Sequence, residues 1–118
     1  MASISSHTLN GTDGSHAGGV AVALFRINED GTRTVFFETA MDEGGRLAET
    51  FDMTDADTKL QFELVFQAGA YFTAQGQVSR SSHRVDEVVL RFRMPDPNGK
   101  YHMPVILNPN SYSTWWSV

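Results

Sequence analysis

The sequence contains no cysteine among its 118 residues. This absence excludes disulfide scaffolds, thiolate metal sites and cysteine nucleophiles, and it is compatible with a reducing compartment. A chain of this length falls within the usual size of one domain and buries most of its unfolded surface without disulfides or metals. We therefore expect one domain over residues 1–118, stabilised by its own hydrophobic core.

Basic residues are few: Lys and Arg number 9 against 14 Asp and Glu, a formal net charge of −5. Proteins that bind nucleic acid usually carry a basic excess, so the sequence argues against DNA or RNA as a partner. No apolar run approaches the roughly 18 residues needed to cross a bilayer. Residues 1–6 lack the basic and apolar parts of a secretory signal, and residues 117–118 form no targeting signal. We expect a cytoplasmic protein without a membrane partner.

Apolar and polar residues alternate with a period of two in residues 59–67 and 85–94, as half-buried strands require. Residues 20–27 are apolar on both faces, which predicts a strand covered on each side, and residues 34–41 form a further predicted strand. The residues predicted to point inward are Leu60, Phe62, Leu64, Phe66, Val88, Leu90, Phe92 and Met94, and those predicted outward are Gln61, Glu63, Gln67, Asp86, Arg91 and Arg93.

Turn-forming residues separate these strands at residues 28–31, 42–45 and 96–99, and Gly31 is free to adopt a positive φ in the first of them. About seven or eight short strands at this spacing predict an all-β sandwich. Residues 68–76 carry apolar and aromatic side chains between two glycines, and periodicity leaves both helix and strand open there.

Four separated motifs resemble those of the 5-hydroxyisourate hydrolases, the enzyme relatives of transthyretin. Residues 6–10 (Ser-His-Thr-Leu-Asn) resemble a first strand that reads Thr-His-Val-Leu-Asp, and residues 44–46 (Gly-Gly-Arg) resemble an Asp-Gly-Arg turn. Residues 101–104 (Tyr-His-Met-Pro) resemble Tyr-His-Val-Pro, and residues 111–114 read Ser-Tyr-Ser-Thr, as in both branches of the family. The motifs keep their order and spacing, so the resemblance covers nearly the whole chain.

The resemblance implies a transthyretin-like (prealbumin-like) eight-stranded β-sandwich in which residues 68–76 form the one short helix. It also implies a homotetramer, a dimer of dimers, whose sites lie in a channel where the dimers meet. The implied activity is hydrolysis of the cyclic amide ring of 5-hydroxyisourate in purine catabolism, without a metal or other cofactor.

The resemblance also implies a catalytic set made of His7, Arg46 and His102. Taken alone, each has an ordinary structural interpretation: His7 and Arg46 as surface residues, and His102 as a core histidine. Hydrolysis of an amide has a use for two imidazoles, because water must lose a proton and the departing nitrogen must gain one. A guanidinium can hold a carbonyl oxygen as it becomes an oxyanion. Which histidine is base and which is acid remains open.

The remaining histidines, His16 and His83, do not match the site positions of the family, and we expect both on the surface. A zinc site is not predicted, because the histidines show no short ligand spacing. The acidic group Asp52, Asp55 and Asp57 lacks the glycine and the terminal glutamate of a calcium loop, so we expect a solvated acidic loop.

The chain departs from the family after residue 114, where Tyr-Arg-Gly-Ser is replaced by Trp-Trp-Ser-Val. Strand alternation places Trp115 on the face of Ser113, the face that borders the channel in the family. We expect substrate contacts from Ser113, Thr114, Trp115 and Val118, in a more apolar pocket that favours an N-methylated hydroxyisourate. The alternative is a non-catalytic, transthyretin-like protein that binds a flat apolar ligand.

Overall fold

The computed structural model describes residues 1–76 and 84–116, which form nine strands, one α-helix and one 3₁₀ helix. In chain order the elements are β1 (Ala2–Asn10), β2 (Ala21–Ile27), β3 (Arg33–Ala40), β4 (Arg46–Phe51), η1 (Asp57–Lys59), β5 (Gln61–Phe66), α1 (Ala68–Gln75), β6 (Val88–Phe92), β7 (Lys100–His102), β8 (Val105–Leu107) and β9 (Tyr112–Thr114).

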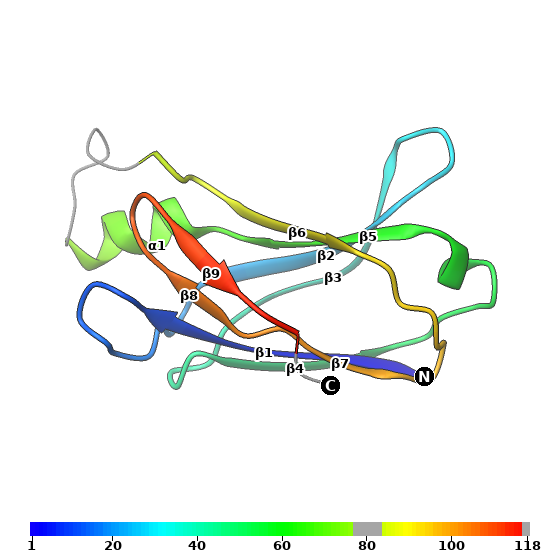
Figure 1. Ribbon diagram of the computed structural model, residues 1–118, viewed down its shortest axis with the longest axis horizontal. Helices are drawn as coiled ribbons and strands as arrows, with labels where there is room; N and C mark the ends of the chain where they lie inside the picture. Colours follow the sequence, from blue (N-terminus) through cyan, green and yellow to red (C-terminus); the bar gives the residue numbers. More distant parts are fainter. Residues whose placement is uncertain (77–83, 117–118) are drawn as a thin grey trace.

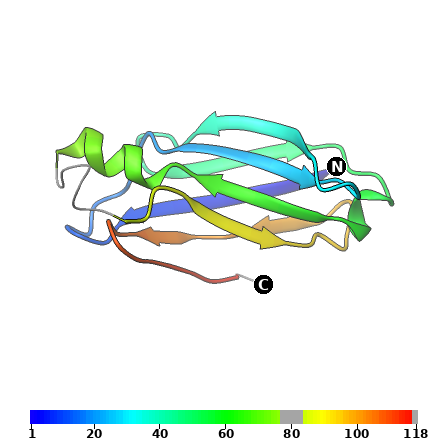
Figure 2. The same ribbon diagram turned by 90° about the horizontal axis from the view of Figure 1, so that it is seen from above.

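The strands form two sheets that lie one on the other. The first has the order β4-β1-β8-β9, with β7 also paired to β1 through residues 100–102, and the second has the order β3-β2-β5-β6. Figure 1 shows the two sheets as separate layers with α1 at one end of the molecule, and Figure 2 shows the second sheet from above. The prediction of an all-β sandwich with one short helix is confirmed.

The strand count differs from the predicted eight because one strand is divided in two. Residues 100–107 run parallel to β1 along its length, but they separate into β7 and β8 around Pro104. Proline has no N–H to donate to the ladder, so regular pairing stops there. β7 pairs only with β1 among the described residues, whereas β8 lies between β1 and β9.

The core lies between the sheets and is built from the alternating residues of each strand. The buried side chains of β5 and β6 include Phe62, Leu64, Phe66, Val88 and Phe92, as predicted. Burial of large apolar side chains is the main favourable contribution to folding. The predicted inward residues Leu60 and Leu90 are only half-buried at the rim.

Two acidic residues were predicted outward or solvated and are instead buried. Glu63 lies on the outer face of β5 but is covered by Arg33 and Arg91, which bind its two carboxylate oxygens at 2.8 and 2.9 Å. Asp57 is buried at the start of η1, where Arg26 Nη1 lies 2.8 Å from Oδ1. The outward position of Glu63 on β5 was predicted correctly. Arginines of β2, β3 and β6 cover the two carboxylates, and those contacts are not local in sequence.

The segment that periodicity left open is the helix α1, as the family resemblance implied. Tyr71 and Phe72 are buried on its inner side, against the end of the sandwich. The helix ends at Gly76, whose φ of 68° is the left-handed conformation that commonly terminates helices. No helix within residues 1–76 and 84–116 is long and apolar enough to span a membrane.

Candidate active site

The predicted catalytic residues lie on one face of the first sheet. Along β1 the even-numbered residues are buried and the odd-numbered ones, including Ser5 and His7, are partly exposed on the outer face. His7 pairs in register with Arg46 of β4, and Ser5 pairs in register with His102 of β7. Residues opposite each other on neighbouring strands project to the same side. Three chain segments therefore bring His7, Arg46 and His102 to one outer surface.

The turn before β4 sets the position of Arg46. Gly45 has a φ of 73°, and a Cβ atom there would lie 2.5 Å from the carbonyl oxygen of Thr8. Only glycine fits that conformation and that close approach. The Gly45 oxygen accepts from the Thr8 N–H at 2.7 Å, and Asp42 Oδ1 accepts from the Arg46 N–H at 2.8 Å. These contacts fix the start of β4 beside β1.

His102 is oriented by a serine from the neighbouring strand. Ser5 Oγ lies 2.8 Å from Nδ1 of His102, and both side chains are half-buried. A hydroxyl can donate or accept, so it can serve either tautomer of the ring. The contact holds the ring through Nδ1, and Nε2 is the ring nitrogen that it does not engage.

His7 is held through Nε2, which lies 3.1 Å from the carbonyl oxygen of Gly44 and 2.8 Å from Nδ1 of His16. The pKa of His7 is lowered from its ordinary value, by burial first and then by the positive charges of Arg46, His16 and His102, while the Gly44 carbonyl acts in the opposite direction. A lowered pKa keeps His7 neutral, and so able to accept a proton, near neutral pH.

His16 is a site neighbour that sequence reasoning missed. It is exposed, as predicted, but its ring meets that of His7, with centroids 4.9 Å apart and planes 25° apart. The loop after β1 folds back, so that Leu9 and His16 form a bridge. Nine positions separate the two histidines, and no strand or helix period joins residues at that spacing. His83 lies outside the described residues.

A shallow cavity of about 300 Å³ lies over this surface. Its lining includes Arg46 and His102 together with Ser5 and Asp42, while His7 lies beside Arg46 across the β1–β4 pair. The surface in and beside the cavity therefore combines two imidazoles, a guanidinium and hydroxyls. This set can take up a proton and stabilise a negative oxygen.

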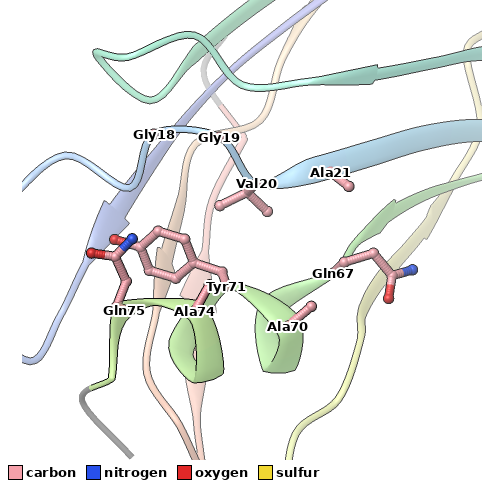
Figure 3. Close-up of a pocket in the computed structure, with 9 residues that line it drawn as sticks. All are labelled: Gly18, Gly19, Val20, Ala21, Gln67, Ala70, Tyr71, Ala74 and Gln75. Atoms are coloured by element: carbon pink, nitrogen blue, oxygen red, sulfur yellow. The ribbon is translucent and has the colours of Figure 1, made fainter.

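A second cavity of about 310 Å³ lies between the start of β2 and the helix α1 (Figure 3). Its lining consists mainly of glycine, alanine and valine, with Gln67, Gln75 and Tyr71 as its polar members. The Tyr71 hydroxyl accepts from Asn10 Nδ2 at 3.3 Å. Its volume is almost the same as that of the first cavity, so the chemistry of the lining, and not the size, favours the first as the candidate site.

The predicted substrate contacts at the C-terminal end differ in their surroundings. Ser113 is exposed and lies in register with Ile106, which in turn is in register with Leu9 on the outer face of β1. Thr114 Oγ1 donates to the Pro104 carbonyl at 2.9 Å, which anchors β9 to the sheet. Trp115 follows β9 and is 48% exposed. Val118 lies outside the described residues.

Trp116 has a defined packing role despite being 49% exposed. Its ring meets Phe92 of β6 edge-on at 5.4 Å and Tyr101 of β7 at 6.4 Å. Phe92 and Tyr101 belong to different sheets, so Trp116 covers the open side of the sandwich. Edge-to-face aromatic pairs of this kind contribute about 0.5–1.5 kcal/mol each beyond area burial.

Within residues 1–76 and 84–116, no three His, Cys, Asp or Glu side chains are grouped closely enough to hold a metal ion. His7 and His16 contact each other, but the neighbouring polar groups are Arg46 and a backbone carbonyl. A guanidinium beside two imidazoles disfavours a cation at this point.

Comparisons with known proteins agree with the fold and the motifs. The model of the HIUase/Transthyretin family matches residues 4–116. The chain is 34% identical to a 5-hydroxyisourate hydrolase of Deinococcus radiodurans, over 95% of this chain and 92% of the relative. It is 31% identical to a 5-hydroxyisourate hydrolase of Halalkalibacterium halodurans, over 95% and 94%.

A solved structure of the 5-hydroxyisourate hydrolase of Klebsiella pneumoniae superimposes with a TM-score of 0.78 at 22% identity, covering 100% of both chains. That likeness supports the transthyretin-like sandwich, and the sequence matches confirm the resemblance drawn from the four motifs. The chain therefore belongs to the HIUase/Transthyretin family.

Proposed function

We propose that this protein hydrolyses the cyclic amide ring of 5-hydroxyisourate or of an N-methylated derivative. The observation that carries the proposal is the gathering of His7, Arg46 and His102 on one outer surface of β4, β1 and β7. The names of the relatives, all 5-hydroxyisourate hydrolases, support a hydrolase of urate and purine catabolism.

The two histidines divide the proton transfers of such a reaction. A neutral imidazole takes a proton from water as the water oxygen attacks the ring carbonyl. The ring C–N bond then breaks, and the departing nitrogen receives a proton from the second imidazole. Positioned acids and bases of this kind typically contribute about 10²–10⁴-fold. The lowered pKa of His7 favours it as the base, which leaves His102 as the acid.

Arg46 is the group we assign to the carbonyl oxygen. Attack by water places a negative charge on that oxygen, and a guanidinium is always charged and offers several donors. Arg46 lines the cavity together with His102, and it pairs in register with His7. An oxygen bound between them would be stabilised during the step in which the negative charge develops.

We assign substrate contacts to Ser113, Thr114, Trp115 and Val118, and we propose that the two tryptophans favour an N-methylated ring. Trp115 is exposed directly after β9, and an indole face has no need of ring N–H partners. Burial of one N-methyl carbon can add roughly 0.8 kcal/mol. Thr114 contributes less through its hydroxyl, which already bonds to Pro104.

We further propose a single-domain cytoplasmic protein that assembles as a homotetramer, a dimer of dimers, with the sites between dimers. In one chain, the aromatic residues Tyr112, Trp115 and Trp116 near the C-terminal end are each more than two-fifths exposed. Large exposed aromatics are typical of protein contacts and ligand surfaces. The same aromatics favour the second candidate, a carrier of a flat apolar ligand.

A stopped-flow ultraviolet trace of freshly generated 5-hydroxyisourate, with and without the protein, separates the two candidates. We expect faster decay of the substrate, and the same assay is run with its N-methylated forms. If none of these compounds decays faster with protein present, the hydrolase proposal is rejected and the carrier is favoured.

A further inference from the structure

His16 is an unassigned imidazole in direct contact with the proposed base. Its Nδ1 lies 2.8 Å from His7 Nε2, while the ring centroids are 4.9 Å apart. Since the nitrogens are so much closer than the ring centres, the two rings meet by their edges. This is the geometry of an N–H···N hydrogen bond between nearly parallel rings.

The direction of that bond follows from a third group. The Gly44 carbonyl can only accept, and it lies 3.1 Å from the same Nε2 of His7. A hydrogen on His7 Nε2 satisfies this contact, and the same hydrogen is shared with His16 Nδ1 as a second acceptor; this assignment makes His7 the donor to both groups. The other ring nitrogen of His7, Nδ1, is then without a hydrogen and able to take a proton.

The backbone around His16 is fixed by contacts that do not involve its ring. The Asn10 N–H donates to the Ser15 carbonyl at 2.8 Å, and the Ala17 N–H donates to the Thr8 carbonyl at 2.9 Å. Thr8 Oγ1 also donates to the Ala17 carbonyl at 2.8 Å. The residues on both sides of His16 are thus tied to β1, which carries His7.

We propose that His16 is a positioning residue for His7: it accepts the Nε2 hydrogen and so keeps Nδ1 free to receive the proton of water. This inference rests on the proposed hydrolase function. A neutral acceptor behind a general base plays the part that a carboxylate plays in other catalytic groups, where it fixes the tautomer and the ring orientation. Here the acceptor is an imidazole rather than a carboxylate, so any positive charge on it would oppose the protonation of His7.

The charged and polar groups around His7 determine how readily its ring takes up a proton. The groups that face His7 are Arg46, His16, His102 and the Gly44 carbonyl. If both imidazoles were protonated, two N–H groups would meet at 2.8 Å, so a charge on His16 opposes the protonation of His7, in agreement with the lowered pKa of His7. A residue with a purely structural role would not have this influence.

The test compares His16→Ala with His16→Asn, because the amide oxygen of asparagine can accept where Nδ1 did but cannot be charged. We expect His16→Ala to lower kcat about tenfold, the change that corresponds to one lost hydrogen bond. His16→Asn should stay close to wild type. Ser15→Ala is the matched control: it removes a hydroxyl bonded to Asp13 in the same loop, away from His7.

The second measurement is made on the protein without substrate. Nitrogen-detected NMR of the histidine rings should show His7 protonated on Nε2, and its pKa should rise in both His16 variants because a neighbouring charge is removed. Three results would each overturn the inference. The first is an unchanged His7 pKa in both variants, and the second is an equal loss of kcat in His16→Ala and Ser15→Ala. The third is a kcat of His16→Asn as low as that of His16→Ala. A wild-type protein without hydrolase activity would reject the proposed function instead, while the NMR result would still decide whether the two rings are paired.

Discussion

Ser5 and His102 are 97 positions apart in the chain, and their side chains meet at 2.8 Å. The parallel pairing of β1 with β7 places them in register on the outer face of the sheet. The serine hydroxyl engages Nδ1 of the imidazole, so the ring is held by β1 as well as by its own strand. This contact orients one of the two histidines proposed to transfer protons.

Removal of this hydroxyl should therefore weaken catalysis without harming the fold. We expect Ser5→Ala to lower kcat about tenfold, the effect of losing one hydrogen bond, with an unchanged thermal midpoint. Ser5→Thr retains a hydroxyl and should recover most of the rate. Ser3→Ala is the control on the same face of β1, in register with Lys100 rather than His102. Equal rates in Ser3→Ala and Ser5→Ala would show that the contact does not orient His102.

Loss of either proposed proton-transfer group should be more severe. We expect His7→Ala and His102→Ala each to lower turnover by at least about 10²-fold, because positioned acids and bases typically contribute that much. Both side chains are partly exposed on the outer face, so circular dichroism and urea unfolding should stay close to wild type. A variant that keeps most of the wild-type rate would assign that histidine a structural role.

The sequence was sufficient to predict the β-sandwich and the sheet face that holds the candidate site. Period-two alternation predicted the buried side chains Phe62 and Leu64, since burial on one face of a strand is a local pattern. The shared face of His7, Arg46 and His102 came from motifs that resemble a family, because pairing between distant strands leaves no periodic signal.

Two features were not predicted, the burial of Glu63 and the contact of His16 with His7, and they have the same physical origin. Glu63 was predicted outward on its strand, yet arginines from β3 and β6 bury it. His16 was separated from the site, yet a folded-back loop joins it to His7. Both errors concern side-chain contacts between segments that are not neighbours in sequence, which alternation within a single strand does not encode.

Glu63 should make the stability of the protein depend on pH. Burial raises the pKa of this carboxyl, but the hydrogen bonds and charges of Arg33 and Arg91 outweigh it, and the net pKa is lowered. A carboxyl whose pKa is lower in the folded state contributes stability above its unfolded pKa of about 4.3. That contribution is lost as the pH falls through the folded-state pKa.

We expect Glu63→Gln to lower the free energy of unfolding by about 1–3 kcal/mol at neutral pH, because two arginines lose a charged acceptor. In urea unfolding, the gap between wild type and variant should narrow as the pH falls below the unfolded pKa. Glu38→Gln, an exposed carboxyl on β3, is the control and should have little effect at any pH. A gap that stays constant with pH would refute the charge contribution of Glu63.

The assembly can be measured directly. We expect light scattering at micromolar concentration to return about four times the chain mass of 13.1 kDa. The reason is that the aromatic side chains near the C-terminal end are exposed in a single chain, and closed symmetric assemblies bury such surfaces. A mass of one chain under these conditions would exclude a site shared between subunits.

The last prediction concerns the two adjacent tryptophans, which differ in their surroundings although both are half-exposed. Trp116 packs against Phe92 and Tyr101, whereas Trp115 directly follows β9, which ends at Thr114. A pocket that hydrogen-bonds ring N–H groups loses affinity for a ring that lacks them, because its own polar atoms stay unpaired. An indole makes no such demand, so we expect wild type to prefer the trimethylated over the unmethylated substrate.

The two positions provide a matched pair of variants, each exchanging an indole for a phenol. Trp115→Tyr should shift the ratio of kcat/KM, methylated over unmethylated, toward the unmethylated ring by about tenfold, the scale set by one or two buried methyl groups. Trp116→Tyr should leave that ratio unchanged and lower the thermal midpoint, because it alters packing across the two sheets. If wild type prefers the unmethylated ring and Trp115→Tyr keeps the same ratio, then Trp115 fills space at a contact and does not select the substrate.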